Sequence, residues 1–296
     1  MKKIRNTLFS GSIVALVTPF DEKGEIDFES LENLIEFHIS EKTDGILPCG
    51  CTGEAATLKH AEQKKIIEFV VEKVKGRIPV VAGTGSNSTD EALDLTSFAK
   101  KAGADAALLI TPYYNKPTPQ GQYLHYQRIA QGVDIPIILY NVPSRTGINM
   151  LPETIARLSK IPNIVAIKEA NPSLDQVSKI LSLCDITVLS GNDSVTLPIL
   201  SVGGKGVISV AANVVPRKIH ELVQNFAEGK FQEACKIHLE LFPLFEALFY
   251  ETNPIPVKES LALMGKIQPN LRLPLCRMGD ESKKKLIRTL EDLKLV

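Results

Sequence analysis

Short runs of apolar, often β-branched residues recur along the chain, and stretches with helical periodicity separate most of them. Each run is nearly continuously apolar, which is typical of parallel strands that are covered on both faces. The starts of the runs lie about 20 to 35 residues apart, the length of one strand and one crossover helix. We predict eight strands: Ser12–Val17, Gly45–Pro48, Pro79–Ala82, Ala106–Thr111, Pro136–Tyr140, Ile164–Lys168, Thr187–Ser190 and Gly206–Val210.

Amphipathic helices are predicted between these strands. From Phe28 to Ile39, apolar residues repeat at intervals of three and four opposite a row of glutamates, which is the pattern of a helix with one buried face. A further helix is expected to begin at Ser88 with a capping box that includes Glu91. The same helix is expected to end at Gly103, because glycine is the commonest residue just past a helix.

Eight strand–helix units form either a closed (β/α)8 barrel or an open doubly wound sheet. The loop after the first strand, Thr18–Asp21, lacks the glycine fingerprint of an open nucleotide-binding sheet. We therefore predict an α/β fold in which residues 1–229 form a (β/α)8 TIM barrel. From Phe231 onward the strand pattern stops, so residues 230–296 are expected to form an all-helical C-terminal extension, with a joint at 253–256.

Composition narrows the classes of function. The 296 residues include 34 basic and 34 acidic side chains, and this balance argues against a nucleic-acid partner, which needs an excess of clustered cations. The apolar run Ile13–Val17 is too short for a signal peptide or membrane span, so we expect a cytoplasmic protein without a membrane partner. Five scattered cysteines indicate reduced thiols. Cys49-x-Cys51 lacks a second ligand pair, so no metal site is predicted.

Lys168 is the most informative residue at a predicted strand end, where TIM barrels carry their reactive groups. It follows the apolar run 164–167, so its amine should be partly desolvated. Desolvation lowers the pKa of a lysine, and a neutral amine attacks carbonyl carbons to form Schiff bases. An isolated lysine just past a strand is usually solvated, however, so the neighbouring residues decide between the two interpretations.

Two neighbours favour chemistry at Lys168. Tyr140 ends the preceding strand, about 4.8 Å away if the strands are paired, and a positioned phenol transfers protons. Arg145 lies in a loop stiffened by proline and glycine, and its planar guanidinium suits a carboxylate. Each residue alone is equally compatible with packing or surface exposure. Together the three indicate a lysine-dependent aldolase that recognises a carboxylate.

Five motifs stand at the predicted strand ends: Gly50–Glu54, Tyr140–Gly147, Ile167–Ala170, Ser190–Asp193 and Gly203–Ser209. Their residues closely resemble those of the 4-hydroxy-tetrahydrodipicolinate synthase family, also called dihydrodipicolinate synthases. The resemblance runs over essentially the whole chain. The lysine motif and Gly-x-Thr-Gly-Glu also occur in sibling aldolases such as N-acetylneuraminate lyase, whereas the Pro-Ser-Arg-Thr-Gly loop is more selective for the synthases.

The resemblance implies a Schiff-base condensation of pyruvate with L-aspartate 4-semialdehyde, in the diaminopimelate route of lysine biosynthesis. It implies no metal or organic cofactor, since the protonated imine itself accepts electrons. It also implies that Tyr114 reaches the active site of a neighbouring subunit, in a homotetramer built as a dimer of dimers. The further roles that it implies are a covalent bond to pyruvate for Lys168, proton transfer for Tyr140, binding of the pyruvate carboxylate for Thr52 and the backbone of Ile208, binding of the semialdehyde for Arg145, and lining of the pocket for Gly191.

One position departs from the family pattern. The family's proton relay passes through a threonine, and Cys51 stands at that position here. A thiol is a weaker hydrogen-bonding group than a hydroxyl, so the relay is expected to be impaired or rearranged.

The resemblance also implies inhibition by L-lysine at a subunit interface, with Gln63 where the most sensitive relatives carry histidine. The matching positions are Ala55, Ala56, His60, Gln63, Asn87, Glu91 and Tyr113. Two alternative functions stay open. The first is a sibling pyruvate-dependent lyase acting on a sugar acid, which Arg145 makes less favoured. The second is a non-catalytic metabolite-binding relative, which only Cys51 supports.

Overall fold

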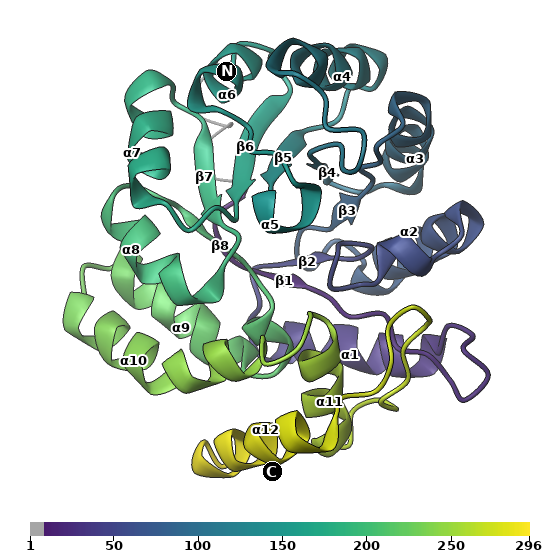
Figure 1. The fold of residues 1–296 in the computed structure, drawn as a ribbon, viewed down its shortest axis with the longest axis vertical. Coiled ribbons are helices and arrows are strands. Elements are labelled where there is room, and N and C mark those ends of the chain that lie inside the picture. The colour runs from purple at the N-terminus through teal and green to yellow at the C-terminus, as the bar shows by residue number, and fades with distance from the viewer. Residues whose placement is uncertain (1–8) are drawn as a thin grey trace.

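A computed structural model describes residues 9–296, and within them eight parallel strands form a nearly closed barrel surrounded by helices (Figure 1). The strands run in the order β2-β1-β8-β7-β6-β5-β4-β3, and a parallel bridge between Ile46 and Val80 joins the two ends of this row. This arrangement confirms the predicted TIM barrel and each predicted strand. The strands are β1 (Gly11–Ala15), β2 (Gly45–Leu47), β3 (Val81–Gly83), β4 (Ala106–Ile110), β5 (Ile137–Asn141), β6 (Ile164–Glu169), β7 (Thr187–Ser190) and β8 (Gly206–Ser209).

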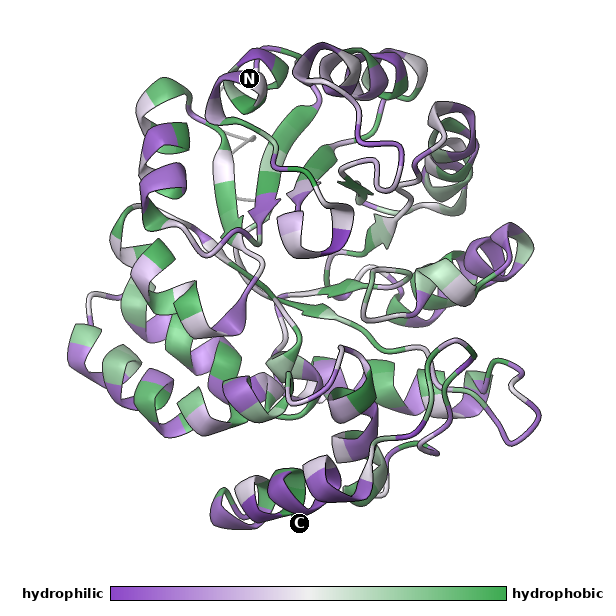
Figure 2. Cartoon of the chain, viewed as in Figure 1, coloured by the Kyte–Doolittle hydropathy of each residue, from purple (hydrophilic) through white to green (hydrophobic). Residues whose placement is uncertain are grey.

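The helices form an outer ring whose apolar faces meet the strands, as the green strands and the mixed green and purple helices of Figure 2 show. Burial of these faces supplies most of the stabilisation of such a layer, at about 25 cal/mol for each Å² of apolar surface. The helices of the ring are α1 (Phe28–Ser40), α2 (His60–Val74), α3 (Thr89–Ala102), α4 (Pro119–Gly132), α6 (Pro152–Leu158), α7 (Leu174–Leu183), α8 (Thr196–Ser201) and α9 (Pro216–Ala227). The short helix α5 (Pro143–Thr146) follows β5 directly and lies over the middle of the barrel (Figure 1).

The helix α3 begins and ends where the sequence predicts, but its N-terminal contacts differ. Ser88 takes the N-cap position without capping the helix through its side chain. Glu91 instead accepts a hydrogen bond from the Ser86 hydroxyl at 2.6 Å, and that same hydroxyl accepts from the Ser88 amide at 3.1 Å. The predicted capping box is therefore wrong, because a hydroxyl two residues earlier competes for the carboxylate. Gly103 ends the helix with φ +94°, a conformation that favours glycine.

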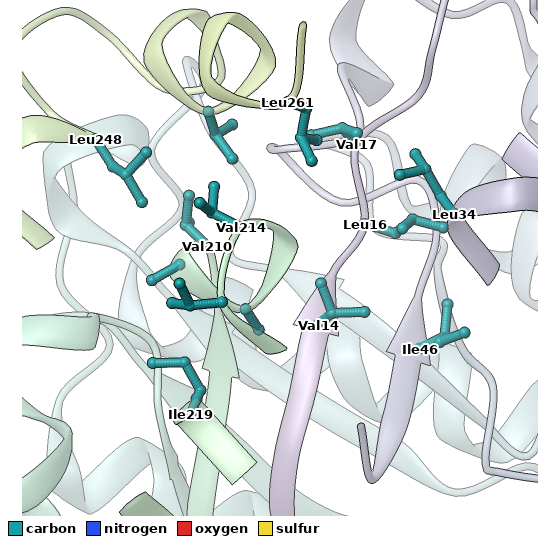
Figure 3. Packing of buried hydrophobic residues seen from close by; sticks show 14 of the residues in the cluster. Val14, Leu16, Val17, Leu34, Ile46, Val210, Val214, Ile219, Leu248 and Leu261 are labelled. Atoms are coloured by element: carbon teal, nitrogen blue, oxygen red, sulfur yellow. The ribbon is translucent and has the colours of Figure 1, made fainter. Parts of the chain in front are cut away.

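The C-terminal residues are helical, as predicted, and comprise α10 (Phe231–Ala247), α11 (Ile255–Leu263) and α12 (Asp280–Asp292). They share one apolar cluster with the barrel. Leu248 and Leu261 from this part of the chain pack with Val17 and Val214 of the barrel (Figure 3). The division into a barrel domain, residues 1–229, and an extension, residues 230–296, stays a prediction.

None of the helices within residues 9–296 combines the length and the apolar character that a bilayer crossing demands. The cytoplasmic location expected from the sequence stays a prediction.

Candidate active site

Lys168 and Tyr140 lie opposite each other on the neighbouring strands β6 and β5, near the carboxyl ends of both. The Lys168 Nζ atom is 4.3 Å from the centroid of the Tyr140 ring. Each side chain is only 5% exposed. The structure thus brings together the amine and the phenol in the way that the order of the strands predicts.

Burial sets the protonation of both groups. It lowers the pKa of Lys168 to about 8, and the nearby Arg145 guanidinium acts in the same direction. Negative charge on the Cys51 sulfur or on the Asp193 carboxyl group acts the other way, because it stabilises an ammonium group. Burial also raises the pKa of Tyr140 well above its ordinary value, so the phenol keeps its proton. An amine that is readily neutral therefore faces a protonated phenol.

A buried polar network on the other face of the same strands holds this pairing in register. Asn141 and Glu169, the residues after Tyr140 and Lys168, are cross-strand partners, and the Asn141 amide donates to the Glu169 carboxylate at 2.9 Å. Gln176 of α7 donates to the same carboxylate at 2.9 Å. Burial raises the pKa of Glu169 to about 7 in spite of these hydrogen bonds. Sequence reasoning missed this network.

A cavity of about 340 Å³ opens over Lys168. Its wall contains most of the predicted binding residues, namely Cys51, Thr52, Tyr140, Arg145 and Gly191, together with Asn253 from the segment between α10 and α11. Glycine is required at position 191, because a Cβ atom there would lie 2.7 Å from the Cβ atom of Ala170. The ends of β6 and β7 can therefore approach each other closely beside the amine.

Asp193 is a buried acid near Lys168 that the sequence analysis left without a role. Its carboxylate accepts hydrogen bonds from the Ser209 hydroxyl and from the backbone amides of Val210 at 3.0 Å and Ala211 at 2.9 Å. These contacts tie the loop after β7 to the end of β8. Asp193 lies in the recognised Ser-Gly-Asn-Asp motif, so the motif was the signal that could have directed attention to it.

A second cavity, of about 530 Å³, adjoins the first and shares Cys51, Tyr140, Arg145 and Asn253 with it. Six of the seven predicted lysine-binding positions line this cavity: Ala55, Ala56, His60, Gln63, Glu91 and Tyr113. The seventh, Asn87, donates a hydrogen bond to the backbone oxygen of Tyr113 at 3.2 Å. The structure thus gathers the predicted effector positions at one place next to the candidate active site.

Comparison with known proteins shows which family has this arrangement of residues. The model of the dihydrodipicolinate synthetase family matches residues 8–293. The chain belongs to the dihydrodipicolinate synthetase family. This confirms the family expected from the motifs.

Relatives of this family match the chain over nearly its full length. A 4-hydroxy-tetrahydrodipicolinate synthase of Syntrophus aciditrophicus is 55% identical over 98% of this chain and all of the relative. A dihydrodipicolinate synthase from Aquifex aeolicus has 52% identity and a TM-score of 0.95, over 97% of this chain and 99% of its own. One from Acinetobacter baumannii, solved in complex with pyruvate, has 42% identity and a TM-score of 0.95, over 97% and 99% of the two chains. The names of these relatives agree with the synthase activity, a lyase reaction, that the sequence motifs predict.

Two residues that the family resemblance had assigned to the site do not line either cavity of the single chain. Tyr114 has φ +69°, is 89% exposed and lines neither cavity. Ile208 is fully buried in the apolar cluster inside the barrel and also lines neither cavity. Cys49 is buried, and burial raises the pKa of its thiol. The thiol therefore stays protonated, which is typical of a structural rather than a reactive cysteine.

Proposed function

We propose that this member of the family condenses pyruvate with L-aspartate 4-semialdehyde through a Schiff base on Lys168. The observation that carries the proposal is the buried amine of Lys168, with a pKa lowered to about 8, next to the protonated phenol of Tyr140. A lysine of ordinary pKa is almost entirely charged at neutral pH and attacks carbonyls slowly. The site therefore favours the first covalent step of an aldolase.

The reaction follows from that step. The neutral amine adds to the ketone of pyruvate, and loss of water from the carbinolamine leaves a protonated imine. Removal of a methyl proton gives an enamine, whose carbon attacks the aldehyde of the semialdehyde. The amino group of the second substrate then closes the ring on the imine carbon and releases Lys168. Carbon and nitrogen are conserved between substrates and product, and neither a metal nor an organic cofactor takes part.

The residues around Lys168 divide the remaining tasks. Tyr140 donates and accepts the protons of the carbinolamine, since its raised pKa keeps a proton available. Thr52 and the backbone at Ile208 hold the carboxylate of pyruvate. Arg145 binds the carboxylate of the semialdehyde, because a guanidinium offers two parallel donors to such a group, and Gly191 lines the same cavity.

Cys51 and Tyr114 complete the proposed proton path. Cys51 lines both cavities and lies close enough to Tyr140 to raise the pKa of its phenol. Tyr114 projects from the loop after β4 and is exposed in the single chain, as a residue that serves a neighbouring subunit must be. We infer a homotetramer, arranged as a dimer of dimers, in which Tyr114 of one subunit enters the site of the next.

L-Lysine is the proposed inhibitor at the second cavity. Its ammonium groups suit the carboxylate of Glu91, and the His60 ring lies 3.8 Å from that carboxylate. The shared wall residues Cys51, Tyr140 and Arg145 give an occupant of this cavity a direct route to the catalytic groups.

The activity is tested with substrates that separate the synthase from its siblings. The purified chain is expected to consume L-aspartate 4-semialdehyde when pyruvate is present. It is expected to release no pyruvate from N-acetylneuraminate or from 2-keto-3-deoxygluconate. Cleavage of either sugar acid without consumption of the semialdehyde would show that the protein is a sugar-acid lyase instead.

A further inference from the structure

Helix α11 is anchored to the loop after β2 by a fully buried ion pair. The Lys258 Nζ atom lies 2.6 Å from a carboxylate oxygen of Glu54, and neither side chain is exposed. Lys258 also donates to the backbone oxygen of Thr18 at 2.8 Å. Ion pairs that are shielded from water in this way are costly to separate, so the two segments hold a constant relative position.

Asn253 lies just before this anchored helix and contacts two of the proposed substrate-binding residues. Its side-chain amide donates to the Thr52 hydroxyl at 3.0 Å. Its backbone oxygen accepts a hydrogen bond from the Arg145 guanidinium at 2.9 Å. Asn253 is 5% exposed and lines both cavities. One residue thus holds Thr52 through its side chain and Arg145 through its backbone.

The direction of the hydrogen bond to Thr52 has a chemical consequence. A hydroxyl has one proton to donate and two lone pairs to accept with. Because the Asn253 amide donates, it occupies a lone pair of the Thr52 oxygen and leaves the hydroxyl proton free. A free proton is what a bound carboxylate needs, since a carboxylate only accepts hydrogen bonds.

We propose that Asn253 is a positioning residue that directs the Thr52 hydroxyl proton toward the carboxylate of the bound keto acid, while its backbone carbonyl separately holds Arg145 for the second substrate. The proposal rests on the proposed function of Lys168 and Thr52. It gives the helical extension a direct part in the active site of the barrel.

The two tasks can be separated by substitution, because only one of them belongs to the side chain. Asn253→Ala removes the donor to Thr52 and keeps the backbone carbonyl. The pyruvate concentration for half-maximal borohydride trapping should rise about 2- to 10-fold, the effect of losing one hydrogen bond. The KM for the semialdehyde should stay unchanged. General distortion of the site would raise both values together.

Asn253→Asp reverses the direction of the hydrogen bond. The new carboxylate accepts the Thr52 proton and repels the carboxylate of the keto acid, so the pyruvate requirement should rise further, by about 10- to 100-fold. Asn270→Asp is the matched control, because Asn270 belongs to the same extension and lines neither cavity. It should bind pyruvate like the unmodified protein.

The outcomes distinguish the inference from the function beneath it. If the unmodified chain traps no pyruvate, the proposed function is wrong. If it traps pyruvate and the two Asn253 variants need no more of it, only the positioning role is wrong. Thermal unfolding of each variant shows that the comparison is made on folded protein, and Asn253→Ala decides alone if Asn253→Asp does not fold.

Discussion

The lowered pKa of Lys168 can be measured as the pH dependence of its reactivity. An amine with a pKa of about 8 is about 9% neutral at pH 7, whereas an ordinary lysine with a pKa of about 10.4 is only about 0.04% neutral. The Lys168 amine should therefore be about 200-fold richer in the reactive form than a surface lysine at this pH. Because the pKa is lowered, the difference shrinks as the pH rises and vanishes above about pH 11.

Trace labelling with acetic anhydride, followed by mass spectrometry of the peptides, reports this neutral fraction for each lysine. We expect labelling of Lys168 to rise with a midpoint near pH 8 and surface lysines to serve as internal references with higher midpoints. Saturating pyruvate should suppress the Lys168 signal only. A Lys168 midpoint that coincides with those of the surface lysines would refute the argument from burial.

A substitution tests the smaller contribution of Arg145 to the shift in the Lys168 pKa. The Arg145 guanidinium lowers the pKa of Lys168 by repelling its charged form, so Arg145→Ala should move the midpoint upward. Arg145→Lys retains the positive charge and should leave the midpoint lower than Arg145→Ala does. If the two variants behave alike, the charge at position 145 does not act on Lys168.

Three further predictions concern neighbouring parts of the molecule. Cys51→Thr should keep or raise the initial rate while Lys168→Ala abolishes it, and an equal loss in both would remove the argument for a relay through position 51. Lys258→Met should lower the unfolding temperature by about 5 to 15 °C, since a buried carboxylate loses its partner. The double variant Glu54→Gln/Lys258→Met should lose less free energy of unfolding than the sum of the two single variants, and strict additivity would contradict a buried ion pair. The control is Lys230→Met, which should leave the stability nearly unchanged because the ion pair of Lys230 with Glu228 is exposed. Millimolar L-lysine should depress the initial rate, and Glu91→Gln should weaken this effect; an uninhibited wild-type enzyme would contradict the proposed effector site.

The barrel and the central pair of residues could be predicted because both follow from local patterns. Continuous apolar runs at regular spacing identify parallel strands, and parallel strands that follow one another in sequence end side by side. The proximity of Tyr140 and Lys168 is a consequence of that rule, and their register in β5 and β6 confirms it.

The contacts that support the site could not be predicted in the same way. Asn253 and Thr52 are 201 residues apart, and Lys258 and Glu54 are 204 apart. No periodicity links such distant positions, and a proline-rich joint between helices carries no chemical signature. The capping box at Ser88 was wrong for a related reason, since local spacing does not show that Ser86 competes for Glu91.

The proposed mechanism depends on a covalent imine between the Lys168 amine and pyruvate. Intact mass measured after incubation with pyruvate and borohydride, followed by peptide mapping, tests it most directly. We expect one reduced pyruvate per chain, on Lys168, and none in Lys168→Ala. An unmodified Lys168, or an adduct on another residue, would contradict it.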